Sequence, residues 1–252
     1  MAAAAYVAIA VAFWWPLPAH AGTAAIAQPF GDPILNAWTL AWDADRMLHG
    51  FARFWTGLFF YPYADTVAYS EHLLGIAVFT APVQWVTGNA ILALNVAMIG
   101  STALAAFGLF LLARELTDKP DAAFAAGVAF ACSPYRVAEA SHLQVLMSGW
   151  MPVTLYGLHR FLATGSTRAL VLFTGVFLLQ AYSNGYFFYF TAVPVTVVAL
   201  HGVWRRRDAA TRLAPRLIAA GVAILAGLAP VAWAYVRVRR EQGLRRLPSD
   251  MC

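Results

Sequence analysis

The chain consists of long apolar runs separated by short polar linkers, with one long polar interruption near its start. A helix needs about 20 mainly apolar residues to cross a bilayer. By this measure the pattern predicts seven membrane-spanning helices, at residues 3–19, 89–113, 121–134, 146–163, 168–183, 185–204 and 214–236. We therefore expect an all-α fold, a polytopic transmembrane helix bundle that forms a single module over residues 1–252, with the spans after the first in residues 89–236.

The first apolar run shares one feature with a secretory signal, because Ala19, His20 and Ala21 resemble a cleavage site. It lacks the basic segment that precedes the apolar part of such signals, and many apolar runs follow it. We interpret residues 1–20 as an uncleaved first span.

The long polar interruption lies at residues 31–72 and is acidic. It holds five of the twelve carboxylates of the chain: Asp32, Asp43, Asp45, Asp65 and Glu71. Segments that span hydrocarbon need no such loop, so we expect residues 21–88 to form an acidic loop outside the bilayer, with interfacial or re-entrant helices.

The apolar residues 72–88, which close this loop, contain Pro82, Gln84 and Gly88. We expect them to lie on the membrane surface or to re-enter it without crossing. A full crossing would reverse the side on which every later linker lies.

Composition and charge agree with a membrane protein, since 61% of the residues are hydrophobic and 12% are charged. The net charge of +5 would also suit nucleic acid, but the basic residues cluster between apolar runs. That distribution is typical of topology control and not of a nucleic-acid groove, so we expect no nucleic-acid partner. With residues 72–88 outside, the clusters at 114–119, 159–168 and 205–216 fall on one side. The positive-inside rule makes that side cytoplasmic. We therefore expect a multi-pass protein of the cytoplasmic membrane with an extracytoplasmic active face.

The end of the chain departs from this rule. Residues 237–252 carry five arginines and would lie outside the cytoplasm. We expect a polar tail over these residues, on a chain truncated from a longer protein.

An amphipathic helix is predicted from Gly31 onward. Leu35, Trp38 and Trp42 recur at three- and four-residue spacing, whereas a second stripe is polar and holds Asn36, Thr39 and Asp43. Asp32 has two compatible interpretations, a cap of this helix and a rigidly held functional carboxylate. Asp43 either faces an aqueous cavity or is an ordinary solvated charge, and Asp45 pairs with Arg46 or with water.

The end of the acidic loop combines Tyr69, Glu71 and His72, after Tyr61 and Tyr63. Aromatic rings beside a carboxylate and an imidazole can bind a sugar by stacking and charge-assisted hydrogen bonds. The alternative for the tyrosines is a belt of aromatic residues at the membrane interface.

A second polar cluster, expected on the same side, contains Arg136, His142 and Gln144. An arginine outside the cytoplasm suggests a specific use, such as bidentate binding of a phosphate, and His142 with Gln144 can help to hold a diphosphate or a metal ion. The alternatives are an ion pair between Arg136 and Glu139 and a helix end at His142. The aromatic residues 182–189 line an isoprenoid groove or anchor the interface.

Other site chemistries have no support in the sequence. The two cysteines, Cys132 and Cys252, give neither a disulfide framework nor zinc spacing. There is no glycine-rich phosphate loop and no HExxH motif.

Four strings occur here in a fixed order: GDP..N.W.L.W at residues 31–42, FYPY.DT.AYSEHLLG beginning at Phe60, SPYR at 133–136 and SHLQ at 141–144. With a first span and a long acidic loop before short-looped spans, the chain resembles the N-terminal half of GT-C membrane glycosyltransferases. The resemblance extends to about residue 204. The chain has fewer spans than those enzymes usually have.

This resemblance implies transfer of a sugar from a polyprenyl-phosphate carrier to a glycan, lipid or protein acceptor at the outer membrane face. It implies that Asp32 is the general base, that Asp43 and Glu71 are supporting acids, and that Arg136 with His142 faces the carrier phosphate. It allows a divalent metal ion as cofactor. The alternatives are a multi-spanning transporter or lipid flippase, which would place ionisable residues inside its spans, and a non-catalytic membrane protein.

Overall fold

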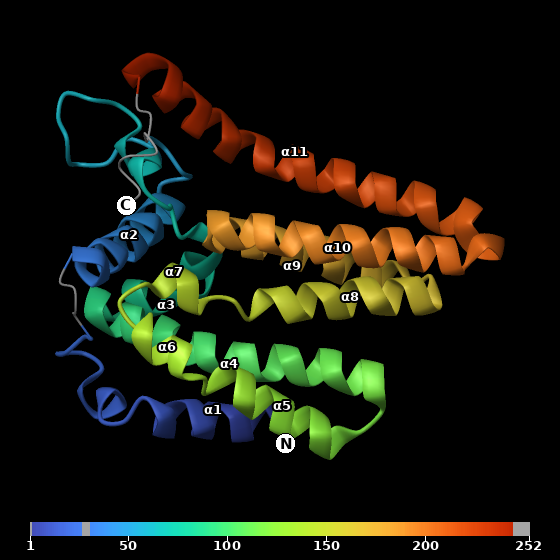
Figure 1. Ribbon diagram of the computed structural model, residues 1–252. Helices are drawn as coiled ribbons and strands as arrows, with labels where there is room; N and C mark the ends of the chain where they lie inside the picture. The colour runs from blue at the N-terminus through green and yellow to red at the C-terminus, as the bar shows by residue number, and fades with distance from the viewer. Residues whose placement is uncertain (1, 27–30, 244–252) are drawn as a thin grey trace.

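The computed structural model describes residues 2–26 and 31–243, and every regular element in those ranges is a helix (Figure 1). The elements follow in the order α1 (Ala2–Phe13), η1 (Leu17–His20), α2 (Gly31–Leu48), η2 (Thr66–Tyr69), α3 (Leu74–Thr87), α4 (Ala90–Thr117), α5 (Pro120–Ala131), α6 (Pro134–Ala138), α7 (Leu143–Leu146), α8 (Trp150–Thr164), α9 (Thr167–Ser183), α10 (Gly185–Arg205), η3 (Arg207–Ala209) and α11 (Ala210–Gln242). The prediction of an all-α chain is confirmed for this part of the sequence.

Within residues 2–26 and 31–243, three helical stretches are long and apolar enough to cross a membrane: α4, α10 and Arg207–Gln242, which contains α11. The apolar helices α1, α3 and α9 are shorter. The structure therefore supports a helical protein with candidate spans and does not confirm the predicted bundle of seven. The reason is length: the 12 residues of α5 give about 18 Å at about 1.5 Å per residue, against a hydrocarbon core of about 30 Å.

The predicted first span is also shorter than expected. Helix α1 ends at Phe13, and a separate 3₁₀ turn, η1, follows. Pro16 and Pro18 lie at this break, where the missing N–H of each proline removes a donor that a continuing helix would use.

The basic linkers gather at one end of the bundle, which we name the basic end (right in Figure 1). The helices are joined there by residues 117–120, 164–167 and 205–210. Arg160 pairs with Glu115 at 3.2 Å between Nη1 and Oε2, and Nη1 of Arg206 donates to the carbonyl of Ala163 at 3.0 Å. Linkers that lie far apart in sequence are thus bonded to one another, as the charge pattern predicts.

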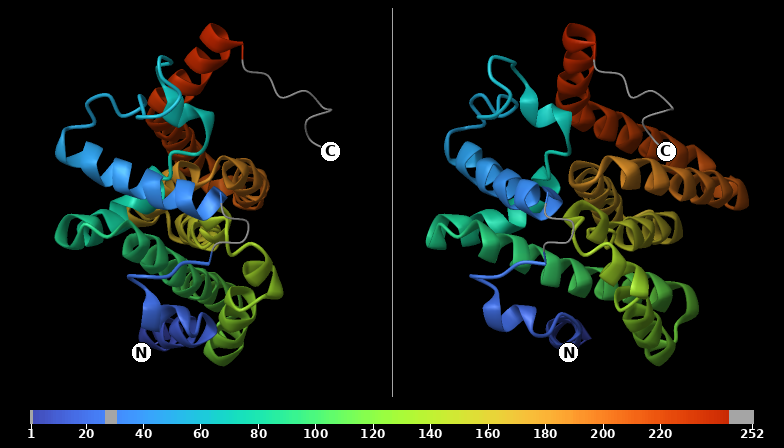
Figure 2. Two further views of the ribbon diagram at one scale, coloured as in Figure 1. Left: turned by 90° about the vertical axis from the view of Figure 1, so that its left-hand side faces the viewer. Right: turned by 60° about the vertical axis from the view of Figure 1, so that its left-hand side comes forward.

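The opposite end of the bundle, which we name the loop end, contains α2, α3, η2, α6 and α7 (left in Figure 1; Figure 2). Helix α3 belongs wholly to it. Gly75, at its start, lies against Ser183 at the end of α9, and Trp85 near its other end donates from Nε1 to the carbonyl of Ala44 at 2.8 Å. The expectation that residues 72–88 do not cross the membrane stays a prediction.

Helix α2 is amphipathic as predicted, but its polar stripe points inward. Asn36, Thr39 and Asp43 are buried, and Trp38 and Trp42 are half-buried and stacked on each other, with centroids 5.4 Å apart and planes 14° apart. The expectation that Asp43 meets water is wrong, since Asp43 is 0% exposed on a helix that packs on both α3 and α4.

Helix α11 continues past the predicted end of its apolar run. Residues 237–242, assigned above to a polar tail, are helical, and Ala234 and Val238 pack against Ala68 of η2. The hydroxyl of Tyr235 donates to the carbonyl of Ser70 at 2.8 Å. Contacts with the acidic loop therefore extend the helix; residues 244–252 of the predicted tail lie outside the described ranges.

Replacing Gly75 by Ala is expected to destabilise the protein by about 1–3 kcal/mol, because an added methyl group would overpack the α3–α9 contact. A Cβ there would lie 2.3 Å from the carbonyl oxygen of Leu179. The matched control is Gly100→Ala, where nothing lies within 4 Å, and which should leave the thermal midpoint in detergent unchanged or raised. Equal midpoints for the two variants would contradict this packing.

Single cysteines at Tyr61, which is 95% exposed at the loop end, and at the exposed Arg206 should label from opposite faces of the membrane. In a background without Cys132 and Cys252, an impermeant maleimide added to intact cells should modify the first site. The second should react only after permeabilisation. Labelling of both in intact cells would refute the orientation.

Candidate functional site

Three side chains from two parts of the loop end meet in a chain of contacts. Nε2 of His142 lies 2.9 Å from Oδ2 of Asp32, and its Nδ1 lies 2.8 Å from Oε2 of Glu139. The side chains are partly open to solvent, with Asp32 44% and His142 33% exposed. The imidazole thus bridges two carboxylates at a surface that a ligand can reach.

Short helices place these groups. Asp32 lies in the first turn of α2, where a carboxylate is favoured by the positive end of the helix dipole. Pro134 begins α6, which ends before Glu139, and His142 precedes α7. Because α6 and α7 are so short, the turn between them brings Glu139 and His142 within reach of each other.

Arg136 does not face solvent and instead fixes the segment that carries Glu139 and His142 to α4. It is 3% exposed, and its Nη2 donates to Oγ of Ser101 at 2.7 Å and to Oγ1 of Thr102 at 3.2 Å. Thr102 also accepts a hydrogen bond from Nε1 of Trp14 at 2.9 Å. The alternative ion pair with Glu139 is not formed, because that carboxylate contacts His142. In this conformation the guanidinium is held by α4 and does not face a phosphate.

Helix α2 is bonded to the same segment at a second point. Nδ2 of Asn36 donates to the carbonyl of Ser141 at 3.3 Å and to Oε1 of Gln144 at 3.2 Å. Gln144, predicted to bind substrate, therefore lies near the Asp32–His142 contact and helps to fix α2 beside it.

The two contacts of His142 have a simple chemical consequence. Both contacts lie at ion-pair distance, although Nδ1 of His142 is buried without a hydrogen-bond partner in this geometry. With both carboxylates ionised and one proton on each imidazole nitrogen, or with Asp32 protonated, the imidazole neutral and Glu139 ionised, the net charge of the group is the same. Asp32 can therefore exchange a proton with His142 without a change in the charge of the site.

The other predicted acids form a second, buried group. Asp43 is 0% exposed and neither carboxylate oxygen has a hydrogen-bond partner, so burial raises its pKa well above its usual range. Oε1 of Glu71 accepts from the N–H of Gly185 at 2.9 Å, whereas Oε2 is buried without a partner. Burial raises the pKa of Glu71 to about 7, against a smaller lowering by that hydrogen bond. Both carboxyls lie within electrostatic range of Tyr235.

His72 and Tyr69, predicted to bind substrate, belong to this inner region. His72 is buried among the rings of Phe54, Trp55 and Tyr182, and burial lowers its pKa to about 4, so the ring is neutral at physiological pH. The hydroxyl of Tyr69 bonds to Oε1 of Gln242. Both residues hold the acidic loop in place, and neither contacts Asp32.

The structure thus divides the predicted residues into two sets. Asp32, His142 and Gln144 come together, with Glu139 as a partner that sequence reasoning had weighed only for Arg136. Its position three residues before His142 was the available signal. Asp43 and Glu71 lie elsewhere, since Asp43 follows Asp32 by eleven residues on α2, or about 16 Å along the helix axis.

A shared metal site is not supported by these residues. Asp32 and Asp43 are too far apart along α2 to bind one ion, and both nitrogens of His142 already face carboxylates. Among the described residues, no three His, Cys, Asp or Glu side chains are arranged to hold a metal ion. We therefore derive no step through a metal.

The raised pKa of Glu71 predicts a pH-dependent stability difference. An unfolded chain loses this proton near pH 4.5 and the folded protein near pH 7, so the stabilising contribution present below pH 4.5 is lost as the pH rises through 7. Glu71→Gln should therefore gain stability relative to the unmodified protein from pH 4.5 to 7. Thermal midpoints in detergent across this range measure the difference; a constant difference would contradict the burial of a protonated carboxyl.

Comparison with protein-family models, with curated proteins and with solved structures finds no match to this chain.

Proposed function

We propose that this chain is a membrane glycosyltransferase of the GT-C type, which transfers a sugar from a polyprenyl-phosphate carrier to an acceptor outside the cytoplasm. The observation that carries the proposal is the contact chain Asp32–His142–Glu139 at the loop end. It joins two of the strings on which the resemblance depends, GDP and SHLQ, although they are more than 100 residues apart in sequence.

In this proposal Asp32 is the general base. As the oxygen of an acceptor hydroxyl attacks the anomeric carbon, a carboxylate oxygen of Asp32 accepts its proton. The new bond forms from oxygen to carbon while the bond from that carbon to the carrier phosphate breaks, and the phosphate leaves with the electron pair. His142 keeps the Asp32 carboxylate oriented and stabilises its charge, and Glu139 does the same for the imidazole.

The position of the group suits a lipid-linked donor. The isoprenoid tail of such a carrier stays in the bilayer, so the reaction must occur at the membrane surface. The candidate spans expose large apolar side chains along their length, for example Val193 and Leu200 on α10 and Leu225 on α11. At the loop end of α10, Tyr186, Tyr189 and Phe190 are exposed, as expected for a surface that meets the interface or an isoprenoid chain.

The predicted role of Arg136 is revised in this proposal. Because its guanidinium is buried on α4, it supports the backbone that carries Glu139 and His142. His142 is then the predicted phosphate-facing residue that lies next to Asp32, and it would have to release one of its two carboxylate contacts to meet the departing phosphate. Direct binding of phosphate by Arg136 would require it to leave Ser101 and Thr102.

Replacing Asp32 by Asn should lower transfer of sugar by about 10²–10⁴-fold, the usual contribution of a general base. The measurement is glycan product formed in membranes that contain the polyprenyl-phosphate donor pool, with folding checked by thermal midpoint. The matched control is Asp45→Asn on the same helix, which removes a carboxylate that pairs only with Arg46 and His49 and should leave turnover unchanged.

His142→Gln should lower turnover less than Asp32→Asn, since it leaves the carboxylate in place. Full turnover by a folded Asp32→Asn protein would remove the proposed base. A transporter would be favoured instead if the unmodified protein transfers no sugar and the Asp32→Asn variant still moves a lipid or solute across the membrane.

A further inference from the structure

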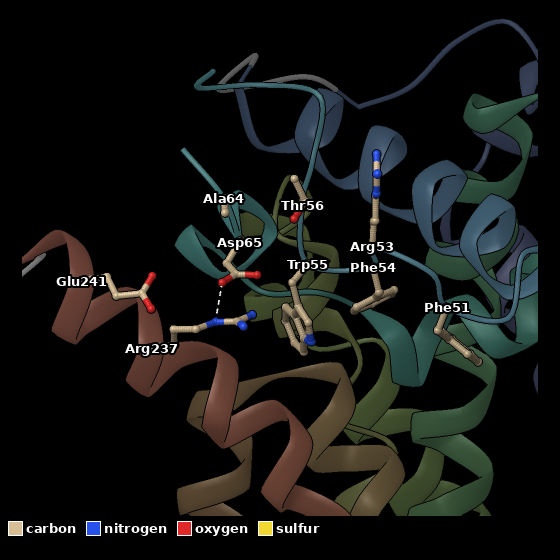
Figure 3. Close-up of a pocket in the computed structure, with 9 residues that line it drawn as sticks. All are labelled: Phe51, Arg53, Phe54, Trp55, Thr56, Ala64, Asp65, Arg237 and Glu241. Carbon is tan, nitrogen blue, oxygen red and sulfur yellow. Dashed lines mark ion pairs between the residues drawn. The ribbon is translucent and has the colours of Figure 1, made fainter. Parts of the chain in front are cut away.

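A cavity of about 410 Å³ lies at the loop end, away from the Asp32 group (Figure 3). One wall comes from the segment that follows α2, with Arg53 and Trp55, and another from Asp65 just before η2. The last turns of α11 supply Arg237 and Glu241. Segments more than 170 residues apart in sequence therefore form this pocket together.

An ion pair between the buried Asp65 and Arg237, whose side chain is 37% exposed, forms part of its lining. Asp65 is 6% exposed, and its Oδ2 lies 2.5 Å from Nε of Arg237, as the dashed line in Figure 3 marks. The neighbouring Gln242 donates from Nε2 to the carbonyl of Ala64 at 3.1 Å. These bonds hold the loop on α11, so donors and acceptors face the cavity in a fixed arrangement.

The charges of the lining balance, since two arginines, Arg53 and Arg237, stand against two carboxylates, Asp65 and Glu241. A strongly charged ligand would find no net attraction there. A neutral ligand with many hydroxyl groups can use both kinds of side chain, because guanidinium groups only donate hydrogen bonds and carboxylates accept them.

Trp55 gives the pocket a rigid aromatic wall. Its ring meets Phe54 at 5.0 Å, His72 at 5.4 Å and Tyr235 at 5.9 Å, in edge-to-face geometry each time. In Figure 3 the indole lies beside the Asp65–Arg237 pair. An aromatic surface next to paired polar groups suits a sugar ring, which has an apolar face and a polar rim.

The backbone around the cavity is unusual. Phe51, Arg53 and Asp65 all line it, and all have a positive φ, of 61°, 53° and 57°. This region is disfavoured for side chains other than glycine, most of all for a bulky one such as Phe51, and such residues cluster at ligand sites.

We propose that this pocket binds a neutral sugar ring, stacked on Trp55 and hydrogen-bonded by Asp65, Arg237 and Glu241. The pocket is inferred from its own lining. Only the identification of that sugar as part of the glycan acceptor rests on the proposed function. From Asp32 to the end of α2 is about 24 Å, at about 1.5 Å per residue, so an acceptor that reaches both places would contain several sugar residues.

The test measures binding of methyl glucoside, galactoside and mannoside to the full chain by saturation-transfer NMR. The chain is held in nanodiscs, because sugar-based detergents would compete, and inorganic phosphate is the anionic probe. At least one glycoside should bind. Glu241→Gln, which changes an exposed side chain and should not disturb folding, is expected to weaken binding several-fold. Trp55→Ala should weaken it about tenfold, the equivalent of about 1.4 kcal/mol, with partial recovery in Trp55→Phe.

The matched control is Trp204→Phe, which changes an exposed indole at the basic end and should leave binding unchanged. The proposal would be overturned if none of the three glycosides binds or if phosphate alone binds. It would also be overturned if the Trp55→Ala and Glu241→Gln variants bind glycosides as tightly as the unmodified protein does. Asp32→Asn should bind glycosides normally. Glycoside binding in a protein whose transfer does not depend on Asp32 would therefore refute the proposed base and leave the pocket standing.

Discussion

The loop end depends on one buried guanidinium. Arg136 is expensive to bury, and Ser101 and Thr102 of α4 compensate by accepting hydrogen bonds from it. This bond fixes α6 to the long helix, and α6 in turn sets where Glu139 and His142 stand. Helices α6 and α7 are too short to be stable as isolated helices. This bond therefore acts together with the hydrogen bonds from Asn36 and the burial of Leu143 and Leu146 to hold the imidazole next to Asp32.

Helix α2 connects several parts of the loop end along its length. Its first turn carries Asp32 to the imidazole, its middle is bonded through Asn36, and a later turn buries Asp43. The segment after it continues into the wall of the cavity that Trp55 and Asp65 line. A rigid helix of 18 residues thus sets the separation between the proposed catalytic carboxylate and the proposed binding pocket. Motions that tilt α2 would change both places together.

The outer turns of α11 explain an apparent violation of the positive-inside rule. Arginines that lie outside the cytoplasm in the proposed orientation have a specific partner in at least one case, since Arg237 pairs with the buried Asp65. Tyr235 and Gln242 add hydrogen bonds to the acidic loop. The helix is extended by these contacts, and the loop gains a fixed shape from them.

The sequence by itself determined the helical class, the start of α2 and the clustering of basic linkers at one end, because these follow from local periodicity and charge spacing. It left open whether Asp45 pairs with Arg46 or with water, and the structure shows the pair with Arg46. Only the tertiary structure decided which helices are long enough to span, that the polar stripe of α2 is buried, and that His142 and not Arg136 takes Glu139. Those outcomes depend on which surfaces meet. The local sequence around a carboxylate such as Asp43 is the same whether water or protein surrounds it, and residues 101 and 102 gave no local sign that they would accept hydrogen bonds from an arginine.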